Sequence, residues 1–545
     1  MTSALALRDE AIGLLDPEQL VGATNADSAG GLNALFASYA ELRSRVEQIA
    51  AYASTGIEDD AMDCFVRGNL EPDGRGLGYG IASKLFGLDG AIRALDADHW
   101  NKALNLLDIY QLMTNDRRNE WGKTITDMKT PPFTAENVRE TLGDLMARRA
   151  EFFAERVDGI FRNLSGEHVT NRPQAFGARM ILAWIHNGSY ADCRRVGYIS
   201  DLRAVVAKFQ GRDEPAWHTT SKIVETALRE RRGEWVDVDG GAFRLRVYLK
   251  GTAHVEVHPE MAWRLNAVLA YRYPRAIASA DRTRPKKLAR EWKPLLRPLP
   301  SRVIAAIASM EHAFDGAGRR DRSGTCWELR CYRADDPALY DAVVEVLTSL
   351  GAVVRGGDVE FPYPASEVIS HVVTSGCVPD QASHQYYPTP AALAADVIAA
   401  AEIESGMTVL EPSAGQGAIA ELVPTGTELL CIEASPLHAA VLHAKGFRCL
   451  TMDFLTAAPN GDKFDRIVMN PPFQGGRWRE HVEAALALLA PGGRLVAVLP
   501  STAPSKLSIP GGATASWSEP IPFHGTSIEV RMLTLTSAAA SEVAA

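Results

Sequence analysis

The sequence predicts an α/β protein whose C-terminal third forms a mostly parallel sheet, preceded by a mainly helical part with a small antiparallel sheet. From Pro388 onward, strand, glycine turn, helix and strand follow one another, which is the order of a parallel sheet. Residues 100–160 carry apolar side chains at three- and four-residue spacing, which predicts helices. Residues 235–258 alternate between apolar and polar side chains, which predicts a three-stranded antiparallel meander.

A chain of 545 residues exceeds what one hydrophobic core supports, so several domains are expected. One helix is predicted to begin after the pair Pro131-Pro132, with Thr134 as its N-cap. We expect the following segments: an N-terminal helical segment (1–60), a mainly helical domain that includes the meander (61–275), a basic proline-rich linker (276–300), a small α/β module (301–380), an α/β domain that carries the chemistry (384–537) and a disordered tail (538–545).

The composition argues against several classes of protein. The seven cysteines are scattered without a CxxC pair, which is typical of reduced thiols rather than of a disulfide framework or a zinc knuckle. No apolar run approaches the ~18 residues of a membrane span. The first residues lack the basic start and apolar core of a signal peptide. We therefore expect a cytoplasmic protein with no membrane partner.

Basic residues are concentrated outside the C-terminal domain, although the whole chain has a net charge of −10. From Ala270 to Arg302 there are ten Lys/Arg and two Asp/Glu, whereas from Tyr386 to the end there are nine Lys/Arg and fifteen Asp/Glu. The basic stretch includes Arg284, Lys286, Lys287 and Arg290. Such clustering is typical of a surface that binds a phosphate backbone. A solvated linker broken by prolines has the same composition and stays open as an alternative.

A glycine motif follows the first strand of the C-terminal domain. The strand leads into Glu411-Pro412, and then Gly415 and Gly417 lie at a predicted turn into a helix. Glycines let the backbone pass close to a ligand, and a helix N-terminus offers free N–H groups. Many α/β folds share this pattern, so by itself it predicts a binding loop for an unspecified ligand.

The next two strands end in carboxylates. Glu433 ends the second strand, and a carboxylate there can accept hydrogen bonds from both hydroxyls of a ribose. This carboxylate also disfavours a nearby phosphate, so the glycine motif and Glu433 together fit a nucleoside better than a nucleotide. The third strand ends in Asp453 and Phe454; the first can accept from the amine of an adenine, and the second can pack against its ring.

The fourth motif is the most specific. A buried strand ends in Asn470-Pro471-Pro472-Phe473. An exocyclic amine is a poor nucleophile because its lone pair is delocalised into the ring. Two fixed acceptors, the Asn470 side-chain oxygen and the Pro471 carbonyl, can bind its two hydrogens, and the prolines hold these acceptors in place. Phe473 offers a flat face on which a planar base or amide can stack.

In order and in residues, the four motifs resemble the Rossmann-like class I methyltransferase fold with its seven-stranded, mostly parallel sheet. The closer similarity is to amino-methyltransferases with the gamma motif order of adenine-specific DNA methyltransferases. This resemblance implies S-adenosylmethionine as cofactor and a flipped-out adenine of double-stranded DNA as substrate. Tyr387, Thr389 and Pro390 resemble the segment that closes over the methionine end of the cofactor. Phe523 falls where relatives place an aromatic ring against the flipped base.

The part of the chain before the catalytic domain resembles phage proteins. The block 335–390 is similar to phage and prophage methyltransferases, and residues of about 60–275 resemble an uncharacterised phage-associated domain fused to such enzymes. Gamma-type restriction methyltransferases carry a target-recognition domain after the catalytic one, whereas here only about ten residues follow the last predicted strand. We therefore expect methylation with low sequence specificity, as in an anti-restriction modification of phage DNA.

Two further groups have competing interpretations. His254, Glu256 and His258 alternate along one strand, but we interpret them as a surface-facing strand and expect no metal. Trp478, between Arg477 and Arg479, follows the Asn-Pro-Pro-Phe motif. This Arg-aromatic-Arg segment could grip a nucleic-acid strand by charge and stacking, or Trp478 could pack inward from the first turn of a helix.

The Asn-Pro-Pro motif leaves the substrate open, because it fits any planar amine. Adenine in RNA and glutamine in a protein are the alternatives within methyl transfer. A non-catalytic binding protein with a methyltransferase fold is the alternative from another class, although it would have no need of Gly415, Glu433 and Asn470 together.

Overall fold

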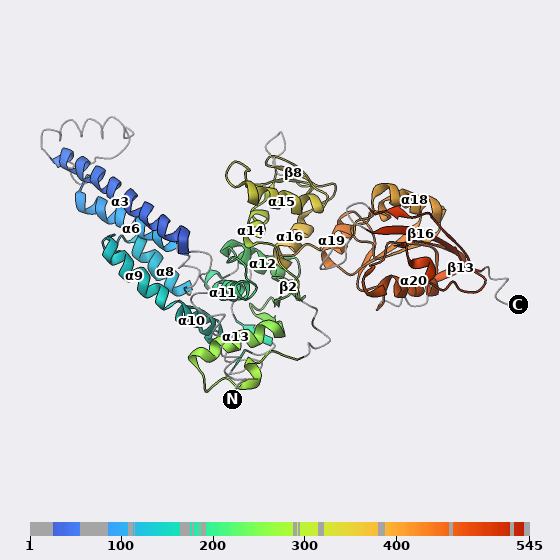
Figure 1. Ribbon diagram of the computed structural model, residues 1–545, viewed down its shortest axis with the longest axis horizontal. Coiled ribbons are helices and arrows are strands. Elements are labelled where there is room, and N and C mark those ends of the chain that lie inside the picture. The colour runs from blue at the N-terminus through green and yellow to red at the C-terminus, as the bar shows by residue number, and fades with distance from the viewer. Residues whose placement is uncertain are drawn as a thin grey trace. The chain divides into compact units, whose positions relative to one another are not determined.

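The computed structural model describes residues 25–54, 86–106, 113, 115–163, 175–176, 179–183, 185–186, 192–286, 292, 295–313, 321–379, 387–456, 462–523 and 528–538 (Figure 1). The chain divides into two compact units. Unit 1 comprises Met1–Trp217 and Arg246–Trp292, and unit 2 comprises His218–Leu245 and Lys293–Ala545. No helix in the described part of the chain is long and apolar enough to cross a membrane.

Unit 1 is mainly helical, and its core is aromatic. Trp100, Phe133 and Phe152 are buried there, and the Trp100 indole donates to the carbonyl of Pro131 at 2.7 Å. Thr134 Oγ1 accepts from the backbone N–H of Asn137 at 3.2 Å, so the predicted helix start is confirmed. The helices and strands of unit 1 are α3 (Asn25–Ser54), α6 (Leu88–Leu106), α8 (Asn115–Thr126), α9 (Ala135–Ala147), α10 (Arg149–Arg162), β1 (Arg179–Leu182), α11 (Cys193–Phe209), β4 (Ala253–Val257), α13 (Pro259–Arg272) and the 3-10 helix η1 (Ser279–Arg282).

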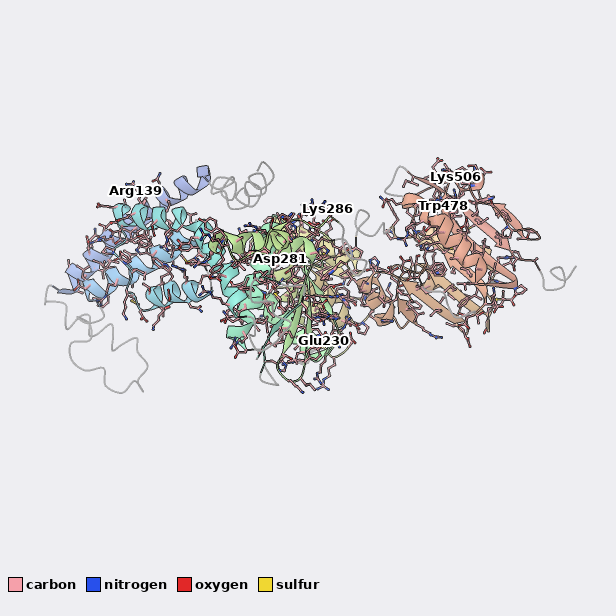
Figure 2. The ribbon with its side chains drawn as sticks, turned by 90° about the horizontal axis from the view of Figure 1, so that it is seen from below. Arg139, Glu230, Asp281, Lys286, Trp478 and Lys506 are labelled. Carbon is pink, nitrogen blue, oxygen red and sulfur yellow. The ribbon has the colours of Figure 1, made fainter. Side chains whose placement is uncertain are left out.

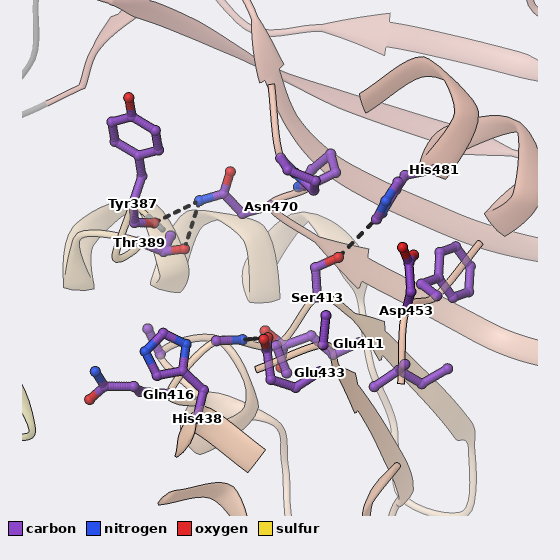
Figure 3. A pocket seen from close by; sticks show the side chains of 18 of the residues that line it. Tyr387, Thr389, Glu411, Ser413, Gln416, Glu433, His438, Asp453, Asn470 and His481 are labelled. Carbon is purple, nitrogen blue, oxygen red and sulfur yellow. Dashed lines mark hydrogen bonds between the residues drawn. The ribbon is translucent and has the colours of Figure 1, made fainter. Parts of the chain in front are cut away.

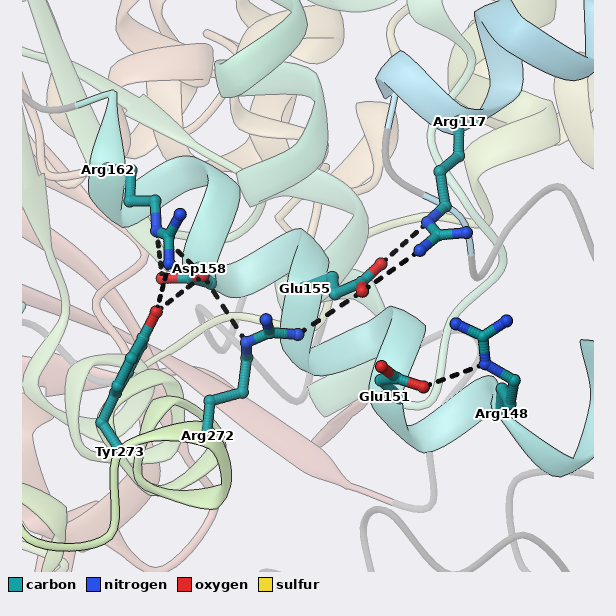
Figure 4. A network of polar contacts seen from close by, with 8 residues as sticks. All are labelled: Arg117, Arg148, Glu151, Glu155, Asp158, Arg162, Arg272 and Tyr273. Carbon is teal, nitrogen blue, oxygen red and sulfur yellow. Dashed lines mark hydrogen bonds and ion pairs between the residues drawn. The ribbon is translucent and has the colours of Figure 1, made fainter.

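A chain of charged side chains links α8, α10 and α13 (Figure 4). Glu155 on α10 accepts from Arg117 of α8 at 2.8 Å and lies 3.5 Å from Arg272 of α13. One turn further along α10, Asp158 lies 3.5 Å from Arg272 and 3.1 Å from Arg162. Each of these two carboxylates lies between two arginines, so the negative charge of α10 is neutralised where the helix meets α8 and α13.

Unit 2 begins with the helix α12 and with two strands of the predicted meander, and it continues into a small α/β module. In this module the strand order is β5-β6-β8-β7, and all pairs are antiparallel. The elements of this part are α12 (Trp217–Arg229), β2 (Val236–Val238), β3 (Phe243–Val247), α14 (Ser301–Ala308), β5 (Glu311–His312), β6 (Cys326–Glu328), α15 (Pro337–Ser349), β7 (Val353–Arg355), β8 (Asp358–Glu360) and α16 (Ser366–Ser375). The boundary between the two units falls inside α12 and β3.

The rest of unit 2 is built on a sheet with the order β11-β10-β9-β12-β13-β16-β14. Strands β11, β10, β9, β12 and β13 are parallel, and β16 is antiparallel to both of its neighbours. This is the topology of a Rossmann-like class I methyltransferase domain, so the predicted fold class is confirmed. The elements are α18 (Ala391–Ala401), β9 (Thr408–Pro412), β10 (Glu428–Glu433), α19 (Pro436–Ala444), β11 (Cys449–Thr451), β12 (Phe464–Met469), α20 (Arg477–Ala487), β13 (Leu489–Pro500), β14 (Thr514–Trp517), β15 (Ile521–Pro522), β16 (Glu529–Thr536) and the 3-10 helices η2 (Ala420–Leu422), η3 (Gln474–Gly476) and η4 (Ala503–Ser505).

Alternation along the central strands gives the sheet two apolar faces. In β12, Ile467 and Met469 belong to the core beneath α20, whereas Val468 between them belongs to the core beneath α18. Successive side chains of a strand point to opposite faces, and a parallel sheet covered on both sides needs apolar residues on both. The apolar end of β12, Ile467–Met469, is therefore buried on both faces, and Asn470 follows it directly at the carboxyl edge of the sheet.

The sheet differs from the prediction at one edge. Instead of one strand beside β16 there are two, β14 and the two-residue β15. Pro520 separates them, and Pro522 lies in β15 itself. Proline has no N–H to donate to a neighbouring strand, so it interrupts the ladder and confines this position to the sheet edge. The sheet therefore contains eight strands instead of seven.

Candidate active site

A cavity of about 260 Å³ lies at the carboxyl ends of the parallel strands β9, β10, β11 and β12 (Figure 3). Ligands of α/β sheets bind at this edge, where the loops after neighbouring strands converge. Most of the residues predicted from the sequence line the cavity: Tyr387, Thr389, Glu411, Gly415, Glu433, Asp453, Phe454, Asn470, Pro471, Pro472, Phe473 and Arg477. They come from segments far apart in the sequence, and the fold brings them together.

Other predicted residues lie elsewhere. Pro390, Pro412 and Gly417 are in the surrounding backbone but are not among the residues that line the cavity. Arg284 and Lys286 belong to unit 1 (Lys286 is labelled in Figure 2). Arg284 is exposed and lies 3.0 Å from Glu260. Lys287 and Arg290 lie outside the described residues.

The glycine loop after β9 is shaped by left-handed backbone. Gly415 has φ +55° and Gly417 has φ +92°. A Cβ on Gly417 would lie 2.9 Å from Cδ2 of Leu442, so glycine is needed there for its conformation and for its small size. The predicted helix after this loop is wrong, because only the short 3-10 helix η2 follows. Val423 and then Pro424 follow it, and proline and the residue before it both disfavour continuation of a helix.

Glu433 holds the glycine loop to the end of β10. Its carboxylate accepts from the backbone N–H of Gly415 at 2.8 Å and of Ser435 at 2.7 Å. Burial raises the pKa of Glu433, while these backbone hydrogen bonds lower it, and the net direction is upward. Each carboxylate oxygen keeps a second lone pair, so Glu433 can still accept hydroxyl groups from a ligand in the cavity.

Asp453 is bound to an arginine that was predicted to contact the substrate. Arg477 donates to its Oδ2 at 2.8 Å, and the backbone N–H of Leu455 donates to Oδ1 at 3.1 Å. Burial raises the pKa of Asp453, but the hydrogen bonds from Arg477 and Leu455 outweigh it, so the pKa lies below its usual range. Asp453 is therefore an ionised acceptor at the mouth of the cavity, and Arg477 is partly neutralised there.

Asn470 is anchored through its amide nitrogen. Nδ2 donates to Oγ1 of Thr389 at 3.1 Å, with a longer contact of 3.5 Å to the carbonyl of Tyr387 (Figure 3). A carbonyl can only accept, so this contact fixes which end of the amide is nitrogen. Both bonds use Nδ2, and Oδ1 of the same amide remains to accept a hydrogen bond from a ligand.

Two predicted substrate contacts need correction. Trp478 is only 5% exposed, and it packs with Val482 and Ala485 of α20 against the sheet, so its ring is not available to stack on a nucleic-acid strand. Phe523 is 4% exposed, and its ring meets that of Tyr387 edge-on at 6.2 Å. Phe523 therefore supports Tyr387 from behind instead of facing a base. Both are large apolar side chains, for which burial in the core is more favourable than exposure.

Ser413 and His481 are among the cavity residues that were not predicted from the sequence. Ser413 Oγ lies 3.2 Å from Nδ1 of His481, which α20 brings over the end of β9. Burial and the nearby Arg477 lower the pKa of His481 to about 4, so the ring is neutral at neutral pH. Among the described residues no partner is found for His481 Nε2 or for Oε2 of the buried Glu411. Burial also raises the pKa of Glu411 well above its usual range.

The described residues contain no group of three or more His, Cys, Asp or Glu side chains that could hold a metal ion. The histidines of the alternating strand have other contacts. His258 caps α13 by accepting from the backbone N–H of Glu260 at 3.1 Å, and the ring of His254 lies 4.7 Å from that of Tyr248. Glu256 forms an ion pair with Arg179.

Comparisons with known proteins give one family match in sequence and several matches in structure. A family model described as a domain of unknown function (DUF4942) matches residues 92–275, and no curated protein matches in sequence. TrmN from Thermus thermophilus is similar in structure, with 20% identity over 37% of this chain and 67% of that chain and a TM-score of 0.25. The 23S rRNA methyltransferase ErmE is 17% identical over 28% of this chain and 70% of that chain, with a TM-score of 0.24. A precorrin-6y C5,15-methyltransferase from Geobacter metallireducens is 14% identical over 27% of this chain and 87% of that chain, with a TM-score of 0.21. At these values, none of the three indicates what this chain acts on.

Proposed function

We propose that this protein is an S-adenosylmethionine-dependent methyltransferase that methylates the exocyclic amine of adenine in DNA. The observation that carries the proposal is the anchored amide of Asn470. With Nδ2 held by Thr389, Oδ1 is a fixed acceptor beside Pro471, Pro472 and Phe473 in the same cavity. An acceptor fixed in advance needs no reorganisation when it binds an amine hydrogen, which favours the transition state over the ground state.

The other end of the cavity fits the cofactor. Glu433 offers carboxylate lone pairs to ribose hydroxyls, and the loop of Gly415 lets a ligand approach the backbone. Oε2 of Glu411 is buried against the cavity, and no partner is found for it in the described part of the chain. A polar group buried in this way is costly unless a ligand satisfies it, so the site is suited to a ligand with polar hydrogens. S-adenosylmethionine, when bound, would supply a methyl group on its sulfonium sulfur, and this sulfur leaves as a thioether when the amine nitrogen takes the methyl group.

In this mechanism the protein binds and orients, and it does not abstract a proton before attack. Asn470 Oδ1 and the Pro471 carbonyl accept the two amine hydrogens and draw the nitrogen lone pair out of conjugation. Phe473 stacks on the base, and the loop prolines hold the acceptors rigid. The proton of the methylated amine leaves to water. Positioning of this kind accounts for rate without a general base.

The decisive experiment identifies the methylated product. The full chain, cofactor with a labelled methyl group and unmodified DNA are incubated, and the DNA is digested to nucleosides. Label in N6-methyldeoxyadenosine supports the proposal. Parallel reactions with RNA and with a protein mixture test the two related substrates, adenine in RNA and glutamine in protein. Label in RNA or protein alone would move the activity to that class, and no label in any of the three would leave the non-catalytic alternative.

Glu433→Ala is expected to weaken cofactor binding. Loss of two charge-assisted hydrogen bonds corresponds to ~1.5–3 kcal/mol, or about 10- to 150-fold in Kd. Titration calorimetry with S-adenosylhomocysteine measures it. Glu428→Ala is the matched control, because this exposed glutamate lies on the same strand, β10, away from the cavity. Equal constants for the Glu433 variant and the wild type would remove Glu433 from the site.

We infer that Arg284, Lys286, Lys287 and Arg290 contact DNA phosphates. Changing all four to Gln should weaken binding to every DNA sequence, and the slope of log affinity against log salt should fall by up to ~0.9 per residue. Arg284 is expected to contribute least, because it is paired with Glu260. The control changes Arg45, Lys123, Lys129 and Arg139, four other exposed cations of unit 1, to Gln. If the salt dependence of binding is unchanged in the variant of Arg284, Lys286, Lys287 and Arg290, this basic stretch is only a linker.

We infer that the methylation has low sequence specificity, in keeping with the resemblance to phage enzymes and an anti-restriction role. Each bidentate base contact discriminates by only ~1–3 kcal/mol, so a site of four to six bases needs several such contacts. Among the described residues, Phe473 packs against the core that includes Ala503 and Leu507, and these two buried residues belong to the loop between β13 and β14. Single-molecule sequencing of DNA from cells that express the protein should show modified adenines in many contexts. Modification confined to one motif of four or more bases would contradict this.

A further inference from the structure

His481 occupies the part of the cavity where the loops after β9 and β11 meet. It lies on α20, its ring packs 5.5 Å from that of Phe454, and it lines the cavity together with Asp453 and Ser413. The proposed function assigns the loop after β9 to the cofactor, and Asp453 in the loop after β11 was expected from the sequence to accept from an adenine amine. Figure 3 shows the imidazole directed from α20 toward Ser413, between Asn470 and Asp453.

The imidazole is held in one orientation. Its Nδ1 lies 3.2 Å from Oγ of Ser413, and Ser413 itself has φ +90°, a backbone conformation that favours glycine. A strained residue persists only where its surroundings impose the conformation, and such residues gather at functional sites. We assign the Ser413 hydroxyl as the donor to Nδ1, and the neutral ring then carries its hydrogen on Nε2 and is a donor there.

This donor is left unsatisfied within the protein. The residue is 3% exposed, and Nε2 has no hydrogen-bond partner among the described residues. A buried N–H without a partner is destabilising, which is why native structures contain few of them. Oε2 of Glu411 and Nε of Arg477, whose residues line the same cavity, also have no partner among the described residues. Unsatisfied polar atoms gathered in one cavity point to a ligand that completes them.

We propose that His481 is a cofactor-binding residue whose Nε2–H donates to a ring nitrogen of the cofactor's adenine. This inference rests on the proposed function, since it assumes that the cavity binds an adenosine-containing cofactor. The role of Asp453 is complementary, because an ionised carboxylate can accept from the adenine amine while His481 donates to an acceptor of the ring. Together they would distinguish adenine from a base with the reverse pattern of donors and acceptors.

The test combines protein variants with ligand analogues and measures binding only. S-adenosylhomocysteine and its 1-deaza, 3-deaza and 7-deaza analogues, each with one ring nitrogen replaced by C–H, are titrated into the full-length wild type and His481→Phe. His481→Phe keeps an aromatic ring against Phe454 but has no nitrogen. We expect it to bind S-adenosylhomocysteine about 5- to 10-fold more weakly, as for one lost hydrogen bond. One of the three analogues should bind the wild type more weakly by a similar factor and should show no further loss with the variant.

Two further variants separate binding from structure. His481→Gln places an amide near the position of Nε2 and should restore most of the affinity, whereas His481→Asn keeps a polar atom near Nδ1 and should not. Ser413→Ala releases the ring from its anchor and should weaken binding by a smaller factor, even if the histidine variants unfold. His443→Gln on α19 is the matched control, because His443 bonds to the carbonyl of Cys449 and does not line the cavity.

The possible results separate this inference from the proposed function. Suppose that the wild type binds S-adenosylhomocysteine, and that each of the three analogues loses the same factor of affinity in the wild type as in His481→Phe. His481 then does not contact the base, while the proposed function stands. If the wild type does not bind S-adenosylhomocysteine, the proposed function fails and takes this inference with it.

Discussion

Asn470→Ala is expected to lower kcat for methyl transfer by about 10³-fold, the usual effect of removing one preorganised polar group at a reacting centre. In the proposed mechanism, Oδ1 contacts the target amine in the transition state, where the amine hydrogens are most polarised. Any loss of cofactor affinity should be much smaller than the loss of rate, because Asn470 is not bonded to the glycine loop and touches the segment expected over the cofactor only through Thr389 and Tyr387. Single-turnover methylation and titration calorimetry with S-adenosylhomocysteine measure the two quantities separately.

Thr389→Val supplies the graded comparison. This variant keeps Asn470 and the shape of residue 389 but removes the hydroxyl that holds Nδ2 at 3.1 Å. The amide then turns more freely, so the rate should fall by less than in Asn470→Ala. Because Thr389 belongs to the segment expected to cover the methionine end of the cofactor, the affinity of this variant for S-adenosylhomocysteine is measured separately by the same calorimetry. Turnover retained by Asn470→Ala would overturn the proposed mechanism. A Thr389 variant with normal turnover would show that the anchor is dispensable.

The fold and most of the cavity could be predicted because their signals are local. A strand that is apolar on both faces followed by Asn-Pro-Pro-Phe can be recognised within ten residues, and the same holds for Glu433 at the end of β10. In a parallel sheet these strand ends meet at one edge, so residues that are local in sequence become neighbours without further information. The strand order confirms the fold class inferred in this way.

The position of His481 and the burial of Trp478 were not predicted, for two different reasons. No periodicity indicates that His481 reaches Ser413, because the two meet only when α20 packs over β9. The burial of Trp478 could have been predicted, because Trp478, Val482 and Ala485 have the spacing i, i+4, i+7 of an apolar helix face. The flanking arginines suggested a nucleic-acid contact, but Arg477 pairs with Asp453 instead.

Arg156→Met is expected to destabilise unit 1 by ~3–5 kcal/mol, the usual range when one partner of a buried ion pair is removed. The Arg156 side chain is 2% exposed, and it donates to Asp201 and to Glu214, each at 2.7 Å. Without it, both carboxylates stay buried with the half-exposed Arg118 as the cation that remains close, at 3.3 Å from Asp201 and 3.0 Å from Glu214. Chemical denaturation of the full chain should show an earlier transition for unit 1.

The pH dependence of the loss gives an independent check on its cause. Burial already raises the pKa of Asp201, and Arg156 opposes this, so removal of Arg156 should raise that pKa further. The folded variant then binds more protons than the unfolded chain above the ordinary aspartate pKa, and its stability must fall as pH rises. The destabilisation should therefore be larger at pH 8 than at pH 5, and Asp201→Asn added to Arg156→Met should recover part of it and weaken the pH dependence. Arg148→Met is the matched control, because this half-exposed arginine precedes the same helix and pairs at the surface with Glu151 and Asp144, so its transition should shift much less. A loss that is equal at both pH values and unaffected by Asp201→Asn would assign the effect of Arg156 to packing of its side chain instead of to its charge.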